Sequence, residues 1–240
     1  MNYDLQNKST PSVNSSIPGG ISQLNHLLDQ NISKGSHALI IGTVSKPIVK
    51  KLLEYFTDIN IITEYYDSVI NIRMTLKDND PIKIKMMDYA HTDFDDKYFD
   101  LIYTQGSISV PERKNILKEI KRILSDGGLL STGEIVSLKE PVAGFIKDIW
   151  ERNGLEPIAS SGIKHYYESR GFEIVSEKDL SDTLRDFYEQ VRYTVSKAGK
   201  DEKEQDKKYF SQIKHESNAY LKLGGDKFIG FKSLIMRKSN

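Results

Sequence analysis

The sequence predicts an α/β fold in which helices cover both faces of a doubly wound, mostly parallel sheet. Short apolar runs of strand length alternate with longer segments whose apolar residues recur at helical spacing, and five such strands precede residue 137. Parallel neighbours need a crossover segment between them, and that crossover is normally a right-handed helical one. The alternation therefore favours a parallel sheet over a sandwich or a helical bundle.

The first expected strand organises the rest of the chain. Residues 36–43 read SHALIIGT, an apolar run that closes on Gly42, and apolar positions between 48 and 56 then mark a core-facing helix with Pro47 near its first turn. Ligands of open α/β sheets lie at the carboxyl ends of the strands. We therefore expect Gly42 and its neighbours to lie against a ligand.

The other elements follow in chain order. A lead-in helix spans residues 21–28, and Gly35 ends that segment. The further strands are expected at 59–63, 82–88, 99–104, 128–136, 172–177 and 228–238, the last either inside the sheet or at its edge. Further helices are expected around 69–76, 116–124, 145–150, 163–170 and 184–195, and Asp126, Gly127 and Gly128 form the stop of the helix around 116–124. Apolar residues between 209 and 220 are expected to bring the chain back toward the core.

Composition limits the classes of partner. Lys and Arg total 34, Asp and Glu also total 34, and the pI is near 7.0, so no overall field favours nucleic acid or an anionic membrane. The absence of cysteine excludes disulfides and thiolate chemistry and agrees with a reducing compartment. No signal peptide or membrane span is recognisable, so a cytoplasmic protein with a small-molecule partner is expected. The oligomeric state is left open, with a homo-oligomer among the alternatives.

Two regions are expected to lie outside the regular sheet. Residues 1–16 are polar and predict a flexible N-terminal tail, whereas 17–240 predict a single domain. Residues 140–222 are expected to contribute helical elements over the substrate, and the charged stretch 197–208 is interpreted as a solvated turn or helix face. The acidic cluster at 93–96 lacks the glycine and distal glutamate of a calcium loop, so no metal site is predicted.

The order of these signals resembles the class I S-adenosylmethionine-dependent methyltransferases, in particular their small-molecule branch. The most specific segment is 99–130, FDLIYTQGSISVPERKNILKEIKRILSDGGLL, and the lead-in segment IPGGISQLNHLLDQ is also similar. The resemblance covers residues 17–136 closely and the remainder loosely. It implies a Rossmann-like, seven-stranded sheet with a small helical lid, and S-adenosylmethionine as cofactor.

The resemblance also implies a set of cofactor-binding residues. Glu64 matches the acid that binds the ribose, Asp88 the acid that accepts from the adenine amino group, and Gln105 a polar position near the methionine moiety. With the first-loop residues and two tyrosines the implied set is Gly42, Thr43, Glu64, Tyr65, Asp88, Tyr89 and Gln105. The alternative for Glu64 is a solvated loop carboxylate, and for Asp88 a turn cap.

The first loop departs from the family pattern, which is close to acid-x-G-x-G-x-G. No acid precedes Gly42, and Val44 and Lys46 stand where further glycines would be expected. Val44 is β-branched and resists positive φ, so the loop takes another path if it needs that conformation there. Ser45 and Lys46 offer replacement polar contacts.

Methyl transfer depends mainly on aligning donor and acceptor, and a general base is needed only if the acceptor must lose a proton early. Glu134, at the end of the fifth strand, is the first candidate for such a base, followed by His26 and His165. A second hypothesis is a methyltransferase fold that has lost or altered the transfer reaction and serves as a binding or scaffold subunit. A nicotinamide-dependent enzyme is disfavoured because G-x-G-x-x-G is absent.

Overall fold

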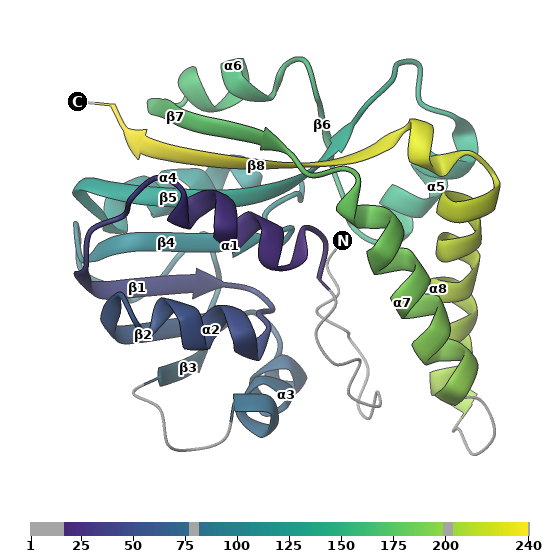
Figure 1. Ribbon diagram of the computed structural model, residues 1–240, viewed down its shortest axis with the longest axis horizontal. Coiled ribbons are helices and arrows are strands. Elements are labelled where there is room, and N and C mark those ends of the chain that lie inside the picture. The colour runs from purple at the N-terminus through teal and green to yellow at the C-terminus, as the bar shows by residue number, and fades with distance from the viewer. Residues whose placement is uncertain (1–16, 77–81, 199–203, 240) are drawn as a thin grey trace.

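The computed structural model describes residues 17–76, 82–198 and 204–239, so the predicted tail at 1–16 lies outside the described residues. One sheet has the strand order β3-β2-β1-β4-β5-β8-β7, and β6 pairs with β5 beside that path (Figure 1). The strands are β1 (Gly35–Ile41), β2 (Phe56–Thr63), β3 (Ile82–Met86), β4 (Phe99–Gln105), β5 (Leu124–Ser137), β6 (Ile158–Ala159), β7 (Phe172–Asp179) and β8 (Ile229–Lys238). The doubly wound, mostly parallel, Rossmann-like sheet is confirmed, with seven ordered strands plus β6.

The helices connect these strands and cover both faces of the sheet (Figure 1). They are α1 (Gly20–Leu28), α2 (Lys46–Leu52), α3 (Tyr66–Leu76), α4 (Arg113–Ile123), α5 (Gly144–Arg152), α6 (Ile163–Glu168), α7 (Thr183–Ala198) and α8 (Glu204–Lys222), with a short 3₁₀ turn at Gly225–Lys227. In the described part of the chain, no helix has the length and apolarity needed to cross a membrane.

Strand β1 lies at the centre of the parallel part of the sheet. It pairs with β2 on one side, where Ile40 lies opposite Ile61, and with β4 on the other, where Ile41 lies opposite Thr104. The chain leaves β1 toward β2 and β3 and later returns to β4 and β5, so the strand order reverses between β1 and β4. Such a reversal opens a crevice at the carboxyl ends of the two strands.

The alternation of side chains along β1 divides the core into two layers. Ala38 and Ile40 pack with apolar residues of α1, α2 and α3, whereas Leu39 and Ile41 pack with those of α4 and α6. Successive side chains of a strand point to opposite faces, so a strand that is apolar at every position must be covered on both sides. The continuous apolar run 38–41 is the sequence signal of that double coverage.

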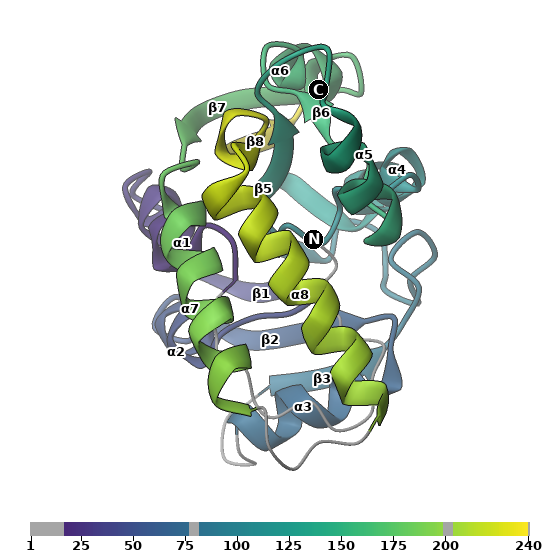
Figure 2. The same ribbon diagram turned by 90° about the vertical axis from the view of Figure 1, so that its right-hand side faces the viewer.

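A third apolar cluster lies where the strands end. Helices α5, α7 and α8 pack on one another around Trp150, Leu184 and Tyr188, together with Ile135 of β5 and Phe231 of β8. Figure 2, viewed from the right-hand side of Figure 1, shows these helices in front of the carboxyl ends of the strands. They occupy the region from which helical lid elements were expected.

The last strand enters the sheet between β5 and β7 and runs antiparallel to both, which decides the alternative left open by its sequence. Its pairing with β5 is long, from Leu130 opposite Met236 to Ser137 opposite Ile229. Strand β8 is buried along most of its length. This position explains why the final segment of the chain is as apolar as a central strand.

Two predicted boundaries were wrong. Helix α4 ends at Ile123 and β5 begins at Leu124, so Gly127 and Gly128 lie inside an irregular start of the strand instead of stopping the helix. The pairing with β4 shifts register there, and Gly127 has a φ of 82°. Gly35 likewise begins β1, because α1 already ends at Leu28. The positive φ of Gly127 explains the first error, because such a φ occurs in a bulge as well as after a helix.

Helix α1 is attached to the sheet through a buried histidine. His26 Nδ1 lies 2.8 Å from Ser233 Oγ of β8, and His26 Nε2 lies 2.8 Å from Ser176 Oγ of β7. Burial, and secondarily the charge of Lys178, lower the pKa of His26 below its ordinary value. The folded protein therefore prefers the neutral ring.

This preference predicts a pH dependence of stability. Below the ordinary histidine pKa of 6.5 the unfolded chain binds a proton at His26 that the folded chain resists, so the free energy of unfolding decreases as the pH falls from 7 to 5. Urea denaturation at several pH values should show a smaller decrease for His26→Gln than for the wild type. His165→Gln, at an exposed position of α6, should retain the wild-type decrease. Equal decreases in wild type and His26→Gln would contradict this assignment.

Candidate functional site

The ends of β1 and β4 meet at Gly42 and Ser107. Gly42 follows β1 with a φ of 90°, and a Cβ placed on it would lie 1.9 Å from Ser107 Oγ and 3.7 Å from the Tyr89 hydroxyl oxygen. Only glycine tolerates both this conformation and this contact. Ser107 was not predicted, and its hydroxyl forms no hydrogen bond within the described part of the chain. The residue pair therefore marks the floor of the crevice between β1 and β4.

The end of β2 lies beside the segment that follows β3. The backbone N–H of Tyr89 donates to Glu64 Oε1 at 3.4 Å, and the Glu64 side chain is exposed. Thr43 and Tyr65, next to Gly42 and Glu64 in the chain, are partly buried. The carboxyl ends of β1, β2 and β3 thus lie side by side, while the contacts of these residues with a cofactor stay predictions.

Asp88 opens the turn after β3. Its Oδ1 accepts from the Ala90 backbone N–H at 2.7 Å, and its Oδ2 lies 3.2 Å from His91 Nδ1. The hydrogen bond from Ala90, followed by that from His91, lowers the pKa of Asp88. Its side chain remains 58% exposed, so the charged carboxylate can cap the turn and still accept from a ligand.

Gln105 has partners within the protein. Its Nε2 donates to the carbonyl oxygens of Pro18 at 2.9 Å and Gly20 at 2.8 Å, and its Oε1 accepts from the Tyr103 hydroxyl at 3.1 Å. The side chain thereby fastens the IPGG segment over the end of β4. Gln105 lies at the predicted edge, but these bonds favour a role in holding that segment, and its contact with a cofactor stays a prediction.

Glu134 lies in a buried network. The hydroxyls of Ser109 and Tyr167 donate to its two carboxylate oxygens, and Arg113 Nε lies 3.2 Å from Oε1. Neither Arg113 nor Glu134 is appreciably exposed, at 3% and 0% of their side chains. Burial and the Glu134 charge raise the pKa of Tyr167 well above its ordinary value, so its hydroxyl stays a donor. Glu134 as a general base stays a prediction that this geometry does not favour.

The same network positions two loops. Arg113 donates from Nε to the Ile108 carbonyl oxygen at 3.0 Å and from Nη2 to the Glu156 carbonyl oxygen at 2.6 Å. It therefore joins the loop after β4 to the segment after α5, next to the carboxyl edge. A charged pair of this kind gives no sequence signal, because its members are distant in the chain and only folding brings them together.

The two histidine candidates lie in different surroundings. His26 is buried between α1 and the strands β7 and β8, with both ring nitrogens beside serine hydroxyls, and His165 is exposed on α6. Within residues 17–76, 82–198 and 204–239, no group of three His, Cys, Asp or Glu side chains is arranged to hold a metal ion.

Comparisons with known proteins concern both the fold and the residues at the carboxyl ends of the strands. Residues 41–132 match the family described as "Methyltransferase domain". This part of the chain is therefore similar in sequence to methyltransferase domains. The match begins at the last residue of β1 and ends within β5, so it includes Gly42, Glu64, Asp88 and Ser107.

A sarcosine/dimethylglycine N-methyltransferase of Halorhodospira halochloris is 30% identical over 116 residues, which are 45% of this chain and 40% of that protein. The match thus spans two fifths of the relative's length.

Two solved structures are similar to this chain. Phosphoethanolamine N-methyltransferase 2 of Haemonchus contortus, in complex with S-adenosyl-L-methionine, has a TM-score of 0.74 and 13% identity. That similarity covers 95% of this chain and 54% of that chain. The [4+2]-cyclase SpnF is similar with a TM-score of 0.72 and 20% identity, covering 92% and 81%. The two solved structures share the fold of nearly the whole chain.

The contact between Gly42 and Ser107 predicts the effect of a single methyl group. Gly42→Ala should destabilise the domain by about 1–3 kcal/mol, because alanine at this φ is strained and its Cβ collides with Ser107. Adding Ser107→Gly should recover the loss of stability that is due to the collision and leave the loss that is due to φ. Urea denaturation measures both. Gly144→Ala, where nothing lies within 4 Å of the added Cβ, is the control for space. No recovery in the double variant would contradict the contact.

The buried ion pair predicts a larger loss of stability. Arg113→Met leaves Glu134 buried without its positive partner and should lower the free energy of unfolding by about 3–5 kcal/mol. Lys114→Met, at the next and exposed position of α4, should change it by no more than about 0.5 kcal/mol. A small effect of Arg113→Met in thermal or urea unfolding would show that the pair is not held as described.

Proposed function

We propose that this protein transfers a methyl group from S-adenosylmethionine to a small-molecule acceptor. The observation that carries the proposal is that Gly42, Glu64 and Asp88 follow three neighbouring parallel strands, β1, β2 and β3, at their carboxyl ends. Carboxylates on neighbouring strand ends, beside a glycine that exposes backbone, suit a nucleoside with hydroxyl and amino donors. The match to the methyltransferase domain family covers this edge.

The residues at the edge fit such a cofactor. Glu64 is exposed and suits the ribose hydroxyls, and Asp88 keeps acceptor capacity for the adenine amino group beyond its bonds within the turn. Gly42 and the Ser107 hydroxyl, which has no hydrogen bond among the described residues, would lie against the rest of the cofactor, beyond its ribose and adenine. Thr43, Tyr65 and Tyr89 would lie beside them. When bound, the sulfonium supplies an electrophilic methyl group.

The protein's contribution to transfer is then mainly positioning. The floor at Gly42 and Ser107 and the cluster of α5, α7 and α8 would enclose donor and acceptor from opposite sides. Alignment at near contact lowers the barrier by up to ~7–11 kcal/mol in favourable cases. An amine with a free electron pair needs no base from the protein, which agrees with the engaged state of Glu134. The likeness to a sarcosine/dimethylglycine N-methyltransferase makes these two amines the first acceptors to test.

A second candidate function is binding without methyl transfer. The first loop supports it, because Val44 is buried in the core where the family pattern would have a glycine. The likeness to a [4+2]-cyclase also shows that the fold alone does not decide the chemistry. Turnover separates the two candidates, because both predict that the cofactor binds.

The proposal predicts which carboxylates hold the cofactor. Titration calorimetry with S-adenosylhomocysteine should show binding to the wild type, and Glu64→Gln and Asp88→Asn should each weaken it by about 10-fold or more, since a hydrogen bond to a charged group contributes ~1.5–3 kcal/mol. Asp95→Asn, on the exposed loop beyond Asp88, should leave the affinity unchanged. Absence of binding to the folded wild type would refute the proposal.

The acceptor is tested separately. Wild-type protein with S-adenosylmethionine should form S-adenosylhomocysteine faster when sarcosine or dimethylglycine is added, or with other small amines if these fail. Cofactor binding without turnover across such a panel would favour the second candidate. Turnover only with a macromolecular acceptor would overturn the small-molecule part of the proposal.

A further inference from the structure

A hollow of about 470 Å³ lies along α4, between this helix and the turn after α6. It is lined by Lys114, Asn115, Leu117, Lys118, Lys121, Arg122 and Arg170. Five of these residues are cationic and none is acidic, although the whole chain has a net charge of zero. The floor combines Leu117 with the aliphatic stems of the lysines, because such side chains cover apolar surface and keep their charges in water.

The positive charge of this hollow is largely uncompensated. Arg122 is paired with Glu119 and Asp96. Lys114 and Lys118, by contrast, form no ion pair or side-chain hydrogen bond with any residue that the structure describes. They lie one helical turn apart, a spacing at which like charges repel on a helix. Lys114 also lies in the first turn of α4, which has no acidic residue, where the helix dipole disfavours a cation.

Arg170 is held in place at the other side of the hollow. Its guanidinium carbon lies 3.5 Å from the ring centroid of Tyr166, and Nη1 donates to the Tyr166 carbonyl oxygen at 2.8 Å. The Nε atom is buried without a hydrogen-bond partner among the described residues. Lys121 Nζ donates to the Arg170 carbonyl oxygen at 3.3 Å, so both cations keep a fixed position relative to α4. Preorganised cations of this kind suit phosphate or carboxylate oxygens.

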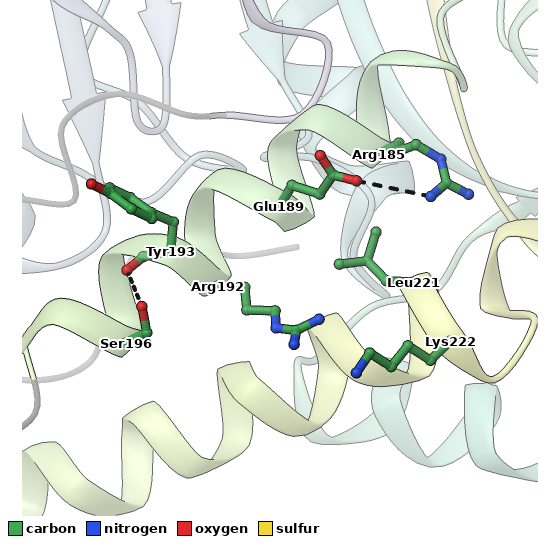
Figure 3. A pocket seen from close by; sticks show the side chains of 7 residues that line it. All are labelled: Arg185, Glu189, Arg192, Tyr193, Ser196, Leu221 and Lys222. Carbon is green, nitrogen blue, oxygen red and sulfur yellow. Dashed lines mark hydrogen bonds and ion pairs between the residues drawn. The ribbon is translucent and has the colours of Figure 1, made fainter.

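Another hollow on the surface differs in this respect. Figure 3 shows the one of about 530 Å³ formed by α7 and α8, where Arg185, Arg192 and Lys222 approach the same space. There Arg185 lies 3.9 Å from Glu189 and 3.8 Å from Asp226, so acidic side chains already compensate part of the charge. The hollow between α7 and α8 thus has arginine and lysine side chains like those beside α4, but with acidic side chains close to them. It therefore serves as a matched control for anion binding.

We propose that the hollow between α4 and the turn after α6 binds a small anion that carries two or more phosphate or carboxylate groups. Lys114 and Lys118 contact groups spaced by about one helical turn, and Arg170 contacts a further oxygen from the opposite side. The ligand offsets the repulsion along α4 and the unfavourable charge at its first turn. This site is separate from the cofactor edge and does not depend on the proposed methyl transfer.

Titration calorimetry at 150 mM NaCl with inorganic tripolyphosphate tests the proposal, and citrate as a second probe distinguishes phosphate from carboxylate recognition. We expect saturable binding with a Kd below ~1 mM for at least one probe, and a loss of about 10-fold or more in Lys114→Gln/Lys118→Gln. The control double variant, Arg192→Gln/Lys222→Gln, should bind as the wild type does. Both pairs lie on exposed or partly exposed helix positions, so both variants should fold.

The outcomes separate clearly. Amide chemical shifts that move on titration only around α4 and Arg170 support the site. No saturation with either probe at 10 mM, or an equal loss of affinity in both double variants, overturns it, because the interaction would then reflect general surface charge. Competition of tripolyphosphate with S-adenosylhomocysteine would also overturn it by placing the anion at the cofactor edge.

Discussion

The reversal of strand order between β1 and β4 is the constraint on which the candidate site depends. Because consecutive helices leave β1 and β4 toward opposite faces, the two strand ends are free of a crossover and can face a ligand. At these strand ends Gly42 and Ser107 lie next to each other, and Ser107 occupies the space that a side chain at residue 42 would need. One glycine with a positive φ is therefore enough to form the floor, even though the loop lacks the further glycines of the family pattern.

That floor depends on a second layer of buried interactions. Arg113 and Glu134 lie beneath the loop after β4 and connect it to α6 and to the segment after α5. Two charges removed from water are stable only when each is paired and hydrogen-bonded, and here both are. The pair converts the loop that carries Ser107 into a fixed support. A carboxylate at a strand end can thus serve the site by holding its frame without touching a substrate.

Charge is arranged locally in this protein. Acidic side chains lie at the ends of β2 and β3, and lysines that have no ion pair among the described residues lie on the outer face of α4. The overall charge of zero conceals this separation, because it averages over surfaces of opposite charge. The helices α5, α7 and α8 form their own apolar cluster together with Ile135 of β5 and Phe231 of β8.

The sequence by itself determined the alternation of strands and helices up to β5, the parallel, doubly wound class of the sheet and the positions of Gly42, Glu64 and Asp88 after their strands. These features depend on periodicity, on turn residues and on the geometry of parallel crossovers, all of which are local or follow from chain order. The cofactor contacts of these three residues stay predictions. The tertiary structure alone decided the insertion of β8 inside the sheet, the contact of Ser107 with Gly42 and the burial of Glu134 against Arg113 and Tyr167. Each of these joins residues far apart in the chain, and no local pattern records which distant side chain will fill a given space or compensate a given charge.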